Sequence, residues 1–213
     1  MNLLKLLKKP KNQVPLPAYP TIEIDDIKPA SALVFYGSPG NKATELVGSR
    51  LYGVRYLPVP FHAALYLSKG EFLNVGKTRQ VLALKKEFKN TRRIDVIEYN
   101  IPARARKAIE TAGRDDTSKV NSVLEKVIKK PVIDYAITDF LRFGFKSIPP
   151  SKKDFCSENV VENMAVAGVE VSDNKAVDTA PWDLAEWAEE HPEVATIYTL
   201  WEGDTFKQKL GRA

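Results

Sequence analysis

Two predicted β-strands separated by only three residues constrain the fold of this chain more than any other feature. Residues 61–67 read FHAALYL and residues 71–76 read EFLNVG, and only Ser-Lys-Gly at 68–70 separates them. A three-residue loop that contains glycine typically joins the two strands of a hairpin. The sequence therefore predicts a hairpin here, and with it the start of an antiparallel sheet.

Other segments extend this sheet and add helices around it. Residues 31–37, 80–88 and 93–100 are further strand candidates. We expect a helix over 102–113, ended by Gly113, and a second helix from Asp115 or Asp116 to a stop at Pro131. Apolar residues at helical spacing predict a core-facing stripe on the second helix, formed by Val120, Val123, Leu124, Val127 and Ile128. Shorter helices are predicted over 42–53, over 134–145 and from residue 156 to a stop at Gly168, so the fold class expected is α+β.

Composition limits the function classes. The 213 residues are 44% apolar and 28% charged, which is typical of a globular chain with a sizeable core. A single cysteine excludes an internal disulfide framework and a cysteine-based zinc site, and only two histidines argue against a metal centre. We therefore expect no metal and no cofactor. The net charge of +5 comes with no recognised nucleic-acid module, so no specific nucleic-acid partner is expected.

The lone Cys156 lies at the start of a predicted helix. An unpaired cysteine is usually a small buried apolar residue. The partial positive charge at a helix N-terminus, however, favours the reactive thiolate and lowers the pKa of a cysteine placed there. This position makes Cys156 a candidate nucleophile, which would need a base and a residue to orient that base.

His62 is the better candidate for the base, because His191 lies in AEEHPEV and is expected at an exposed helix end. His62, Ala64 and Tyr66 share one face of their predicted strand. A symmetric hairpin loop centred on Lys69 places Asn74 diagonally across from His62, and a two-residue shift places it directly opposite. A one-residue slip separates the two, and the sequence does not decide the loop type. If they pair, Asn74 can orient the imidazole.

Two segments resemble known enzymes. HAALYLSKGEFLNVG, residues 62–76, resembles the histidine hairpin of NlpC-type cell-wall peptidases and amidases. FCSENVV, residues 155–161, resembles the cysteine motif of that superfamily's circularly permuted branch, the YiiX-like hydrolases, in which the histidine precedes the cysteine as it does here. Weaker similarities at 30–37, 180–187 and 195–201 bring the coverage to roughly residues 28–202. Asn74 departs from the histidine or acidic residue common in relatives.

The resemblance implies a permuted papain-like fold and a thiol hydrolase with Cys156 as nucleophile, His62 as base and Asn74 as its orienter. It also implies an oxyanion contact from the Cys156 amide and from Tyr135 or Asp134. Asp95 and Glu98 are alternative orienters of His62. We expect Ser157 and Glu158 to cap and charge the first turn of the helix. Trp182 and Trp187 lie five residues apart on a predicted helix and do not share one face, so at least one of them is expected to pack in the core.

The expected organisation is a basic, proline-rich N-terminal arm at 1–27, a hydrolase domain at 28–205 with a helical insertion near 100–130, and a tail at 206–213. The expected substrate is a peptidoglycan peptide or another amide. The alternative is a structural or adaptor protein of a larger assembly, such as a phage particle, that retains the hydrolase fold and docks through its arm. No secretion signal and no transmembrane segment are expected. Synthesis in the cytoplasm, with delivery to the cell wall or incorporation into a virion, follows from that expectation.

Overall fold

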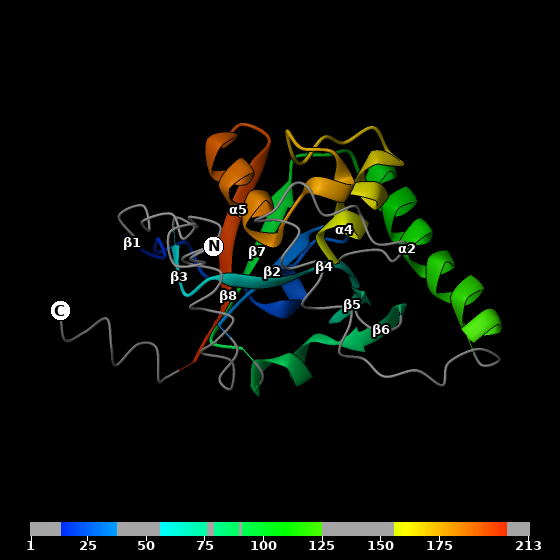
Figure 1. Ribbon diagram of the computed structural model, residues 1–213, viewed down its shortest axis with the longest axis horizontal. Helices are drawn as coiled ribbons and strands as arrows, with labels where there is room; N and C mark the ends of the chain where they lie inside the picture. The colour runs from blue at the N-terminus through cyan, green and yellow to red at the C-terminus, as the bar shows by residue number, and fades with distance from the viewer. Residues whose placement is uncertain (1–13, 38–55, 76–78, 90, 125–155, 204–213) are drawn as a thin grey trace, which may run out of the picture.

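The computed structural model describes residues 14–37, 56–75, 79–89, 91–124 and 156–203. Within these ranges six strands form one antiparallel sheet in the order β6-β5-β4-β2-β7-β8 (Figure 1). Their bounds are β2 Ala32–Tyr36, β4 Pro60–Ser68, β5 Glu71–Val75, β6 Arg79–Ala83, β7 Arg93–Tyr99 and β8 Ala195–Glu202. The predicted α+β class is confirmed at this level.

Helices cover one face of the sheet. They are α2 (Ala103–Leu124), α4 (Cys156–Ala165) and α5 (Pro181–Glu190) (Figure 1). Apolar residues of β4 that point to this face, Ala63, Leu65 and Leu67, share a core with Val160 and Met164 of α4. This layer fixes α4, and therefore Cys156, against the strand that carries His62.

The opposite face has its own smaller core. Ala64 and Tyr66 of β4 pack there with Phe35 of β2 and Phe72 of β5. The short 3-10 helix η3 (Leu84–Lys89) closes this side, with the Phe88 ring stacked on Trp201 at 4.8 Å. The predicted alternation of side chains along residues 62–67 is thus confirmed. Successive side chains of β4 point to opposite faces of the sheet, and each set is buried in its own core.

The β4–β5 turn is tighter than expected. Ser68 pairs with Glu71, so only Lys69 and Gly70 form the loop, and both have positive φ, at 53° and 71°. Two consecutive residues with positive φ match the right-handed twist of the strands in a two-residue hairpin turn. An irregularity in the register between Tyr66 and Ser68 compensates for the shorter loop. Tyr66 therefore pairs with Phe72, the pairing that a symmetric loop centred on Lys69 would also give.

Part of the expected N-terminal arm belongs to the domain. Strand β1 (Val14–Pro15) pairs with β3 (Tyr56–Leu57), and Leu16 is buried in the helix-side core. Thr21 bridges to Thr199 of β8, and the 3-10 helix η2 (Ile24–Asp26) follows. Residues 14–27, which the sequence assigns to the arm, thus make pairing and packing contacts with the domain, while residues 1–13 and the tail from 206 lie outside the described residues.

The helix prediction over 102–113 is wrong at its end, because α2 continues through Gly113 to Leu124 as one helix. Gly113 is buried, and a Cβ atom placed there would lie 3.0 Å from Leu67 Cδ2 and 3.2 Å from Leu65 Cδ2. The glycine therefore permits close approach of the helix to β4. The second predicted helix is thus merged with the first as far as Leu124; the remainder, and the helices predicted over 42–53 and 134–145, lie outside the described residues.

Other predicted ends are confirmed. Gly168 has φ +69° and donates to Ala165 O, while Val169 donates to Met164 O, which is the hydrogen-bond pattern of a Schellman motif. The strand expected over 80–88 forms only as β6, and η3 takes its second half. Trp182 and Trp187 are both buried, where burial of at least one was expected.

We expect Gly113→Ala to lower the free energy of unfolding by about 1–2 kcal/mol, because overpacking against Leu65 and Leu67 outweighs the gain of about 1 kcal/mol in helix propensity. Chemical denaturation followed by circular dichroism measures it. Thr111→Ala, at an exposed position of the same helix, is the matched control and should be neutral or stabilising. Equal or greater stability of the Gly113→Ala protein would contradict the packing explanation.

Candidate functional site

The hairpin brings His62 and Asn74 together. Imidazole Nε2 of His62 lies 2.7 Å from Asn74 Oδ1. The register that pairs Leu65 with Leu73 places Asn74 across from Ala64, so His62 lies on the diagonal, as the symmetric alternative required. An amide oxygen only accepts hydrogen bonds, so Nε2 carries the hydrogen and the neutral ring keeps its lone pair on Nδ1.

The surroundings of His62 are largely apolar. Its ring centroid lies 5.3 Å from that of Phe35 and 6.5 Å from that of Phe61. Burial lowers the pKa of His62 from 6.5 to about 4, and the hydrogen bond to Asn74 only partly opposes this shift. His62 is therefore neutral near pH 7, which is the protonation state of a general base.

Cys156 is the first residue of α4, and its side chain is only 4% exposed. The backbone N–H of Ala63, the residue after His62, is near enough to the thiol to lower its pKa. Tyr66 N–H donates to the carbonyl oxygen of Ser31, the residue just before β2. Successive N–H groups of a strand point to opposite edges, so the N–H of Ala63, three residues earlier, points toward β5. Ala63 precedes the paired segment, which begins at Leu65–Leu73. The thiol thus lies beside the backbone of His62, where β4 and β5 are no longer paired.

The pKa of Cys156 shifts in the direction opposite to that expected from its helix position. Burial raises it from 9.0 to about 11, and the hydrogen bonds from the amides of Ala63, Ser157 and Cys156 itself reduce the shift without reversing it. Desolvation disfavours the thiolate more than these few dipoles favour it. The resting site therefore contains a thiol and a neutral imidazole rather than an ion pair.

Ser157 does not cap the helix as expected. Its hydroxyl is buried and donates to Thr179 O at 2.5 Å, which ties α4 to the segment after the 3-10 helix η4 (Ala176–Asp178). Glu158, in the first turn, is half-buried. Ser157 thus has a structural role in holding the first turn of α4 in place.

The alternative orienters of His62 have other partners. Asp95 accepts from Arg93 Nε at 2.7 Å and from the Thr199 hydroxyl at 3.1 Å. Glu98 accepts from the backbone N–H and the ammonium of Lys28. Of the three candidates, Asn74 is therefore the one that hydrogen-bonds His62. Tyr135 and Asp134, the expected oxyanion contributors, lie outside the described residues.

Sequence reasoning missed Asn159, one turn after Cys156. Its side chain is 1% exposed, and its Nδ2 atom is buried without a hydrogen-bond partner. The neighbouring Asn163 donates to Asn159 O and Oδ1 instead. The available signal was its position: asparagine at i+3 from a helix-start cysteine faces the same side as the thiol.

The part of the chain that the structure describes contains no group of three or more His, Cys, Asp or Glu residues arranged to hold a metal ion. The described helices also include none with the length and apolar composition required to cross a membrane.

Comparison with known proteins does not assign this chain to a family. No protein-family model matches it, and no curated protein matches it significantly.

We expect an NMR titration of the His62 ring to give a pKa of about 4. Asn74→Asp should raise this pKa, because a carboxylate stabilises imidazolium, and Asn74→Ala should lower it, because the bond that favours the charged ring is lost. Since the folded-state pKa is depressed, stability related to His62 is present above pH 6.5 and is lost as the pH falls toward 4. A measured pKa near 6.5 in the wild-type protein would contradict the burial described here.

The alkylation rate of Cys156 by iodoacetamide should rise with pH toward 11, because only the thiolate reacts. With no other cysteine in the chain, mass spectrometry reports this site alone. Unfolded protein in denaturant is the control and should follow the ordinary pKa near 9. A rate that levels off at neutral pH would show a preformed thiolate and contradict this expectation.

Proposed function

We propose that this protein is a cysteine hydrolase that cleaves an amide bond, with Cys156 as nucleophile, His62 as general base and Asn74 as the residue that orients His62. The 2.7 Å contact between His62 Nε2 and Asn74 Oδ1 carries the proposal. It holds the ring in the tautomer whose Nδ1 accepts a proton, and the thiol of Cys156 lies against the next amide of the same strand.

The first step starts from the neutral thiol of Cys156 and the neutral imidazole of His62. His62 Nδ1 takes the thiol proton while Sγ attacks the carbonyl carbon of the substrate, which forms a tetrahedral oxyanion. The N–H of Cys156, at the first position of α4, is a donor for this oxyanion. The C–N bond then breaks, and His62 returns the proton to the leaving amine. Water, deprotonated by His62, hydrolyses the thioester and regenerates the thiol.

The order of the residues along the chain supports a permuted papain-like arrangement. His62 and Asn74 lie on adjacent strands of an antiparallel sheet, and the cysteine follows them at the start of a helix packed on that sheet. This is the order that the similarity to YiiX-like hydrolases requires.

A peptidoglycan peptide is the substrate class we favour, on the similarity to NlpC-type enzymes alone. The overall positive charge of the chain does not add support for a peptidoglycan substrate. Residues 156–203 contain one basic residue, Lys175, and eleven acidic ones: Glu158, Glu162, Glu170, Asp173, Asp178, Asp183, Glu186, Glu189, Glu190, Glu193 and Glu202. The helices α4 and α5 are therefore acidic, and attraction to an anionic polymer is not expected from them.

The alternative function, a structural or adaptor protein, draws support from the burial of the thiol. Cys156 is 4% exposed and has a raised pKa. Both properties are also expected of a cysteine that serves only as a packed apolar residue. Under this alternative the His62–Asn74 pair would stabilise the hairpin and perform no chemistry.

The test is release of amines from purified peptidoglycan and from small peptide amides. We expect Cys156→Ala and His62→Ala to lower the rate by at least about 10³-fold, and Asn74→Ala by about 10–100-fold, since the orienter does not itself transfer a proton. A covalent acyl-enzyme trapped on Cys156 in acid-quenched reactions would identify the nucleophile.

His191→Ala is the matched control, because His191 is the only other histidine and caps the far end of α5. It should retain wild-type activity. Activity that survives Cys156→Ala would contradict the assignment of Cys156 as nucleophile. Absence of activity on all amide substrates with the fold intact would support the structural or adaptor alternative.

A further inference from the structure

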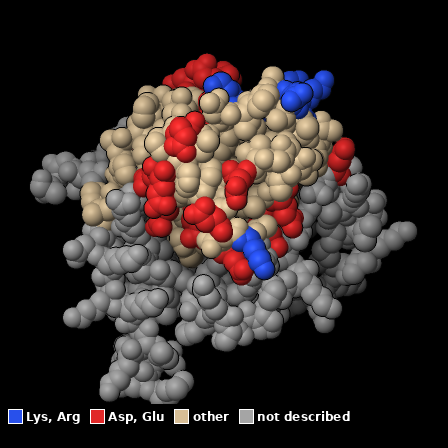
Figure 2. All heavy atoms as spheres, turned by 90° about the horizontal axis from the view of Figure 1, so that it is seen from above, with Lys and Arg blue, Asp and Glu red and all other residues tan. Residues whose placement is uncertain are grey.

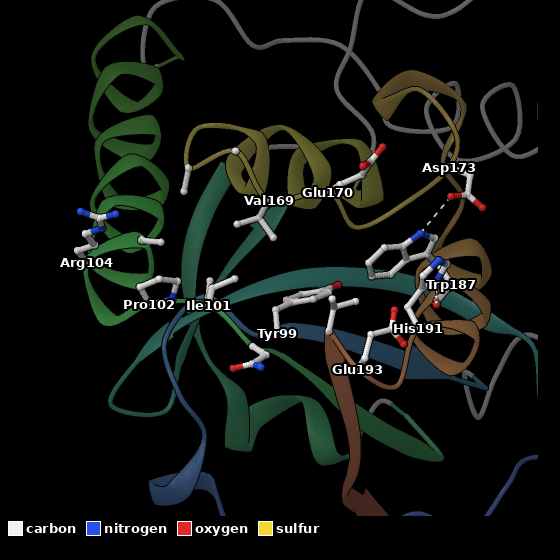
Figure 3. Close-up of a pocket in the computed structure, with 15 residues that line it drawn as sticks. Tyr99, Ile101, Pro102, Arg104, Val169, Glu170, Asp173, Trp187, His191 and Glu193 are labelled. Carbon is white, nitrogen blue, oxygen red and sulfur yellow. Dashed lines mark hydrogen bonds between the residues drawn. The ribbon is translucent and has the colours of Figure 1, made fainter.

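A second site lies at the other end of α4 from Cys156. A cavity of about 540 Å³ is formed by the end of β7, the start of α2, the turn after α4 and the end of α5 (Figure 3). This volume lies within the range of small-molecule sites. A helix of ten residues is about 15 Å long, so the cavity is separate from the proposed catalytic residues.

Tyr99 supplies an unused polar atom in the lining. Its side chain is 2% exposed, yet its hydroxyl has no hydrogen-bond partner among the described residues. Figure 3 shows the ring lying across the cavity with the hydroxyl on the side of Trp187. A buried hydroxyl without a partner costs about 1–3 kcal/mol, which a bound polar group would offset.

Aromatic rings form the wall that the hydroxyl faces. The Trp187 indole and the His191 imidazole stack with centroids 4.3 Å apart and 19° between their planes. Trp187 Nε1 donates to Asp173 Oδ1 at 3.2 Å, and His191 Nδ1 lies 2.8 Å from Trp187 O. A carbonyl only accepts, so Nδ1 carries hydrogen, and Nε2 of the neutral ring is an acceptor.

The charge of the lining is acidic. Glu170, Asp173 and Glu193 contribute carboxylates, and Arg104 is the only Lys or Arg among the described residues of the lining. Arg104 lies at the opposite end from the Trp187–His191 stack in Figure 3. The face seen in Figure 2 likewise carries mostly acidic groups around an uncharged area. An indole face, hydrogen-bond acceptors and carboxylates together attract a cation and repel an anion.

We propose that this cavity binds the ammonium group of a small alkylamine. The ammonium lies against the Trp187 ring, donates to the Tyr99 hydroxyl oxygen and is neutralised by Asp173 and Glu193. The alkyl chain extends along the apolar part of the lining, formed by Ile101, Pro102 and Val169.

The test uses cadaverine (1,5-diaminopentane) as the probe, with 1-pentanol and pentanoate as neutral and anionic controls, followed by amide NMR. Cadaverine should saturably shift the Trp187 indole N–H and the Gly168 amide, and the controls should not. Tyr99→Phe and the double variant Asp173→Asn/Glu193→Gln should each weaken binding by about 3–10-fold, the range of a lost hydrogen bond or a screened charge.

Glu190→Gln is the matched charge control, because Glu190 is exposed on α5 and does not line the cavity. It should bind cadaverine as the wild-type protein does, and thermal melting verifies that each variant is folded. The proposal is overturned if cadaverine produces no saturable shift, if pentanol or pentanoate binds equally well, or if the folded Tyr99→Phe and double variants bind as the wild type does. Binding by a Cys156→Ala protein should be unchanged, which separates this result from the fate of the hydrolase proposal.

Discussion

The pairing register between β4 and β5 is the constraint on which the rest of the structure depends. The Lys69–Gly70 turn and the irregularity before Ser68 together pair Tyr66 with Phe72 and Leu65 with Leu73. A slip of one residue would move every side chain of β4 to the other face. Leu65 and Leu67 would leave the helix-side core, and His62 would lose Asn74. Burial on both faces of β4 makes such a slip too costly, so the same apolar packing that stabilises the fold also holds the His62–Asn74 pair.

Burial also determines the chemistry available to the proposed site. Removing a thiol and an imidazole from water disfavours the charged form of each, which raises one pKa and lowers the other. The two shifts move the pair away from a thiolate–imidazolium state and toward neutral partners. A substrate that brings its own polar groups into the site would change this balance, because its carbonyl develops the charge that the amides at the start of α4 can stabilise.

Charge is distributed unevenly along this chain. The helices α4 and α5 and the turns around them are acidic, although the whole chain has a net charge of +5. Cys156 lies at one end of α4 within this acidic segment, and the turn after α4 contributes to the Tyr99 cavity at the other end. A ligand with a cationic group is thus better matched to this part of the molecule than the overall charge indicates.

The sequence by itself determined the local elements: the hairpin, the alternation along residues 62–67, the helix that begins at Cys156 and its end at Gly168. These depend on side-chain periodicity and on turn residues, which are local properties. It also offered Asn74 as a partner of His62, but left three registers open. Only the tertiary structure selected among them, because the choice depends on two cores packed against opposite faces of β4. Gly113 is a second case in which the tertiary structure decided. Local rules predict that a helix ends at this glycine, but the helix continues through it because Gly113 packs closely against Leu65 and Leu67. The thiol pKa likewise depended on how deeply the start of α4 is buried, a quantity that the neighbouring residues in the sequence do not encode.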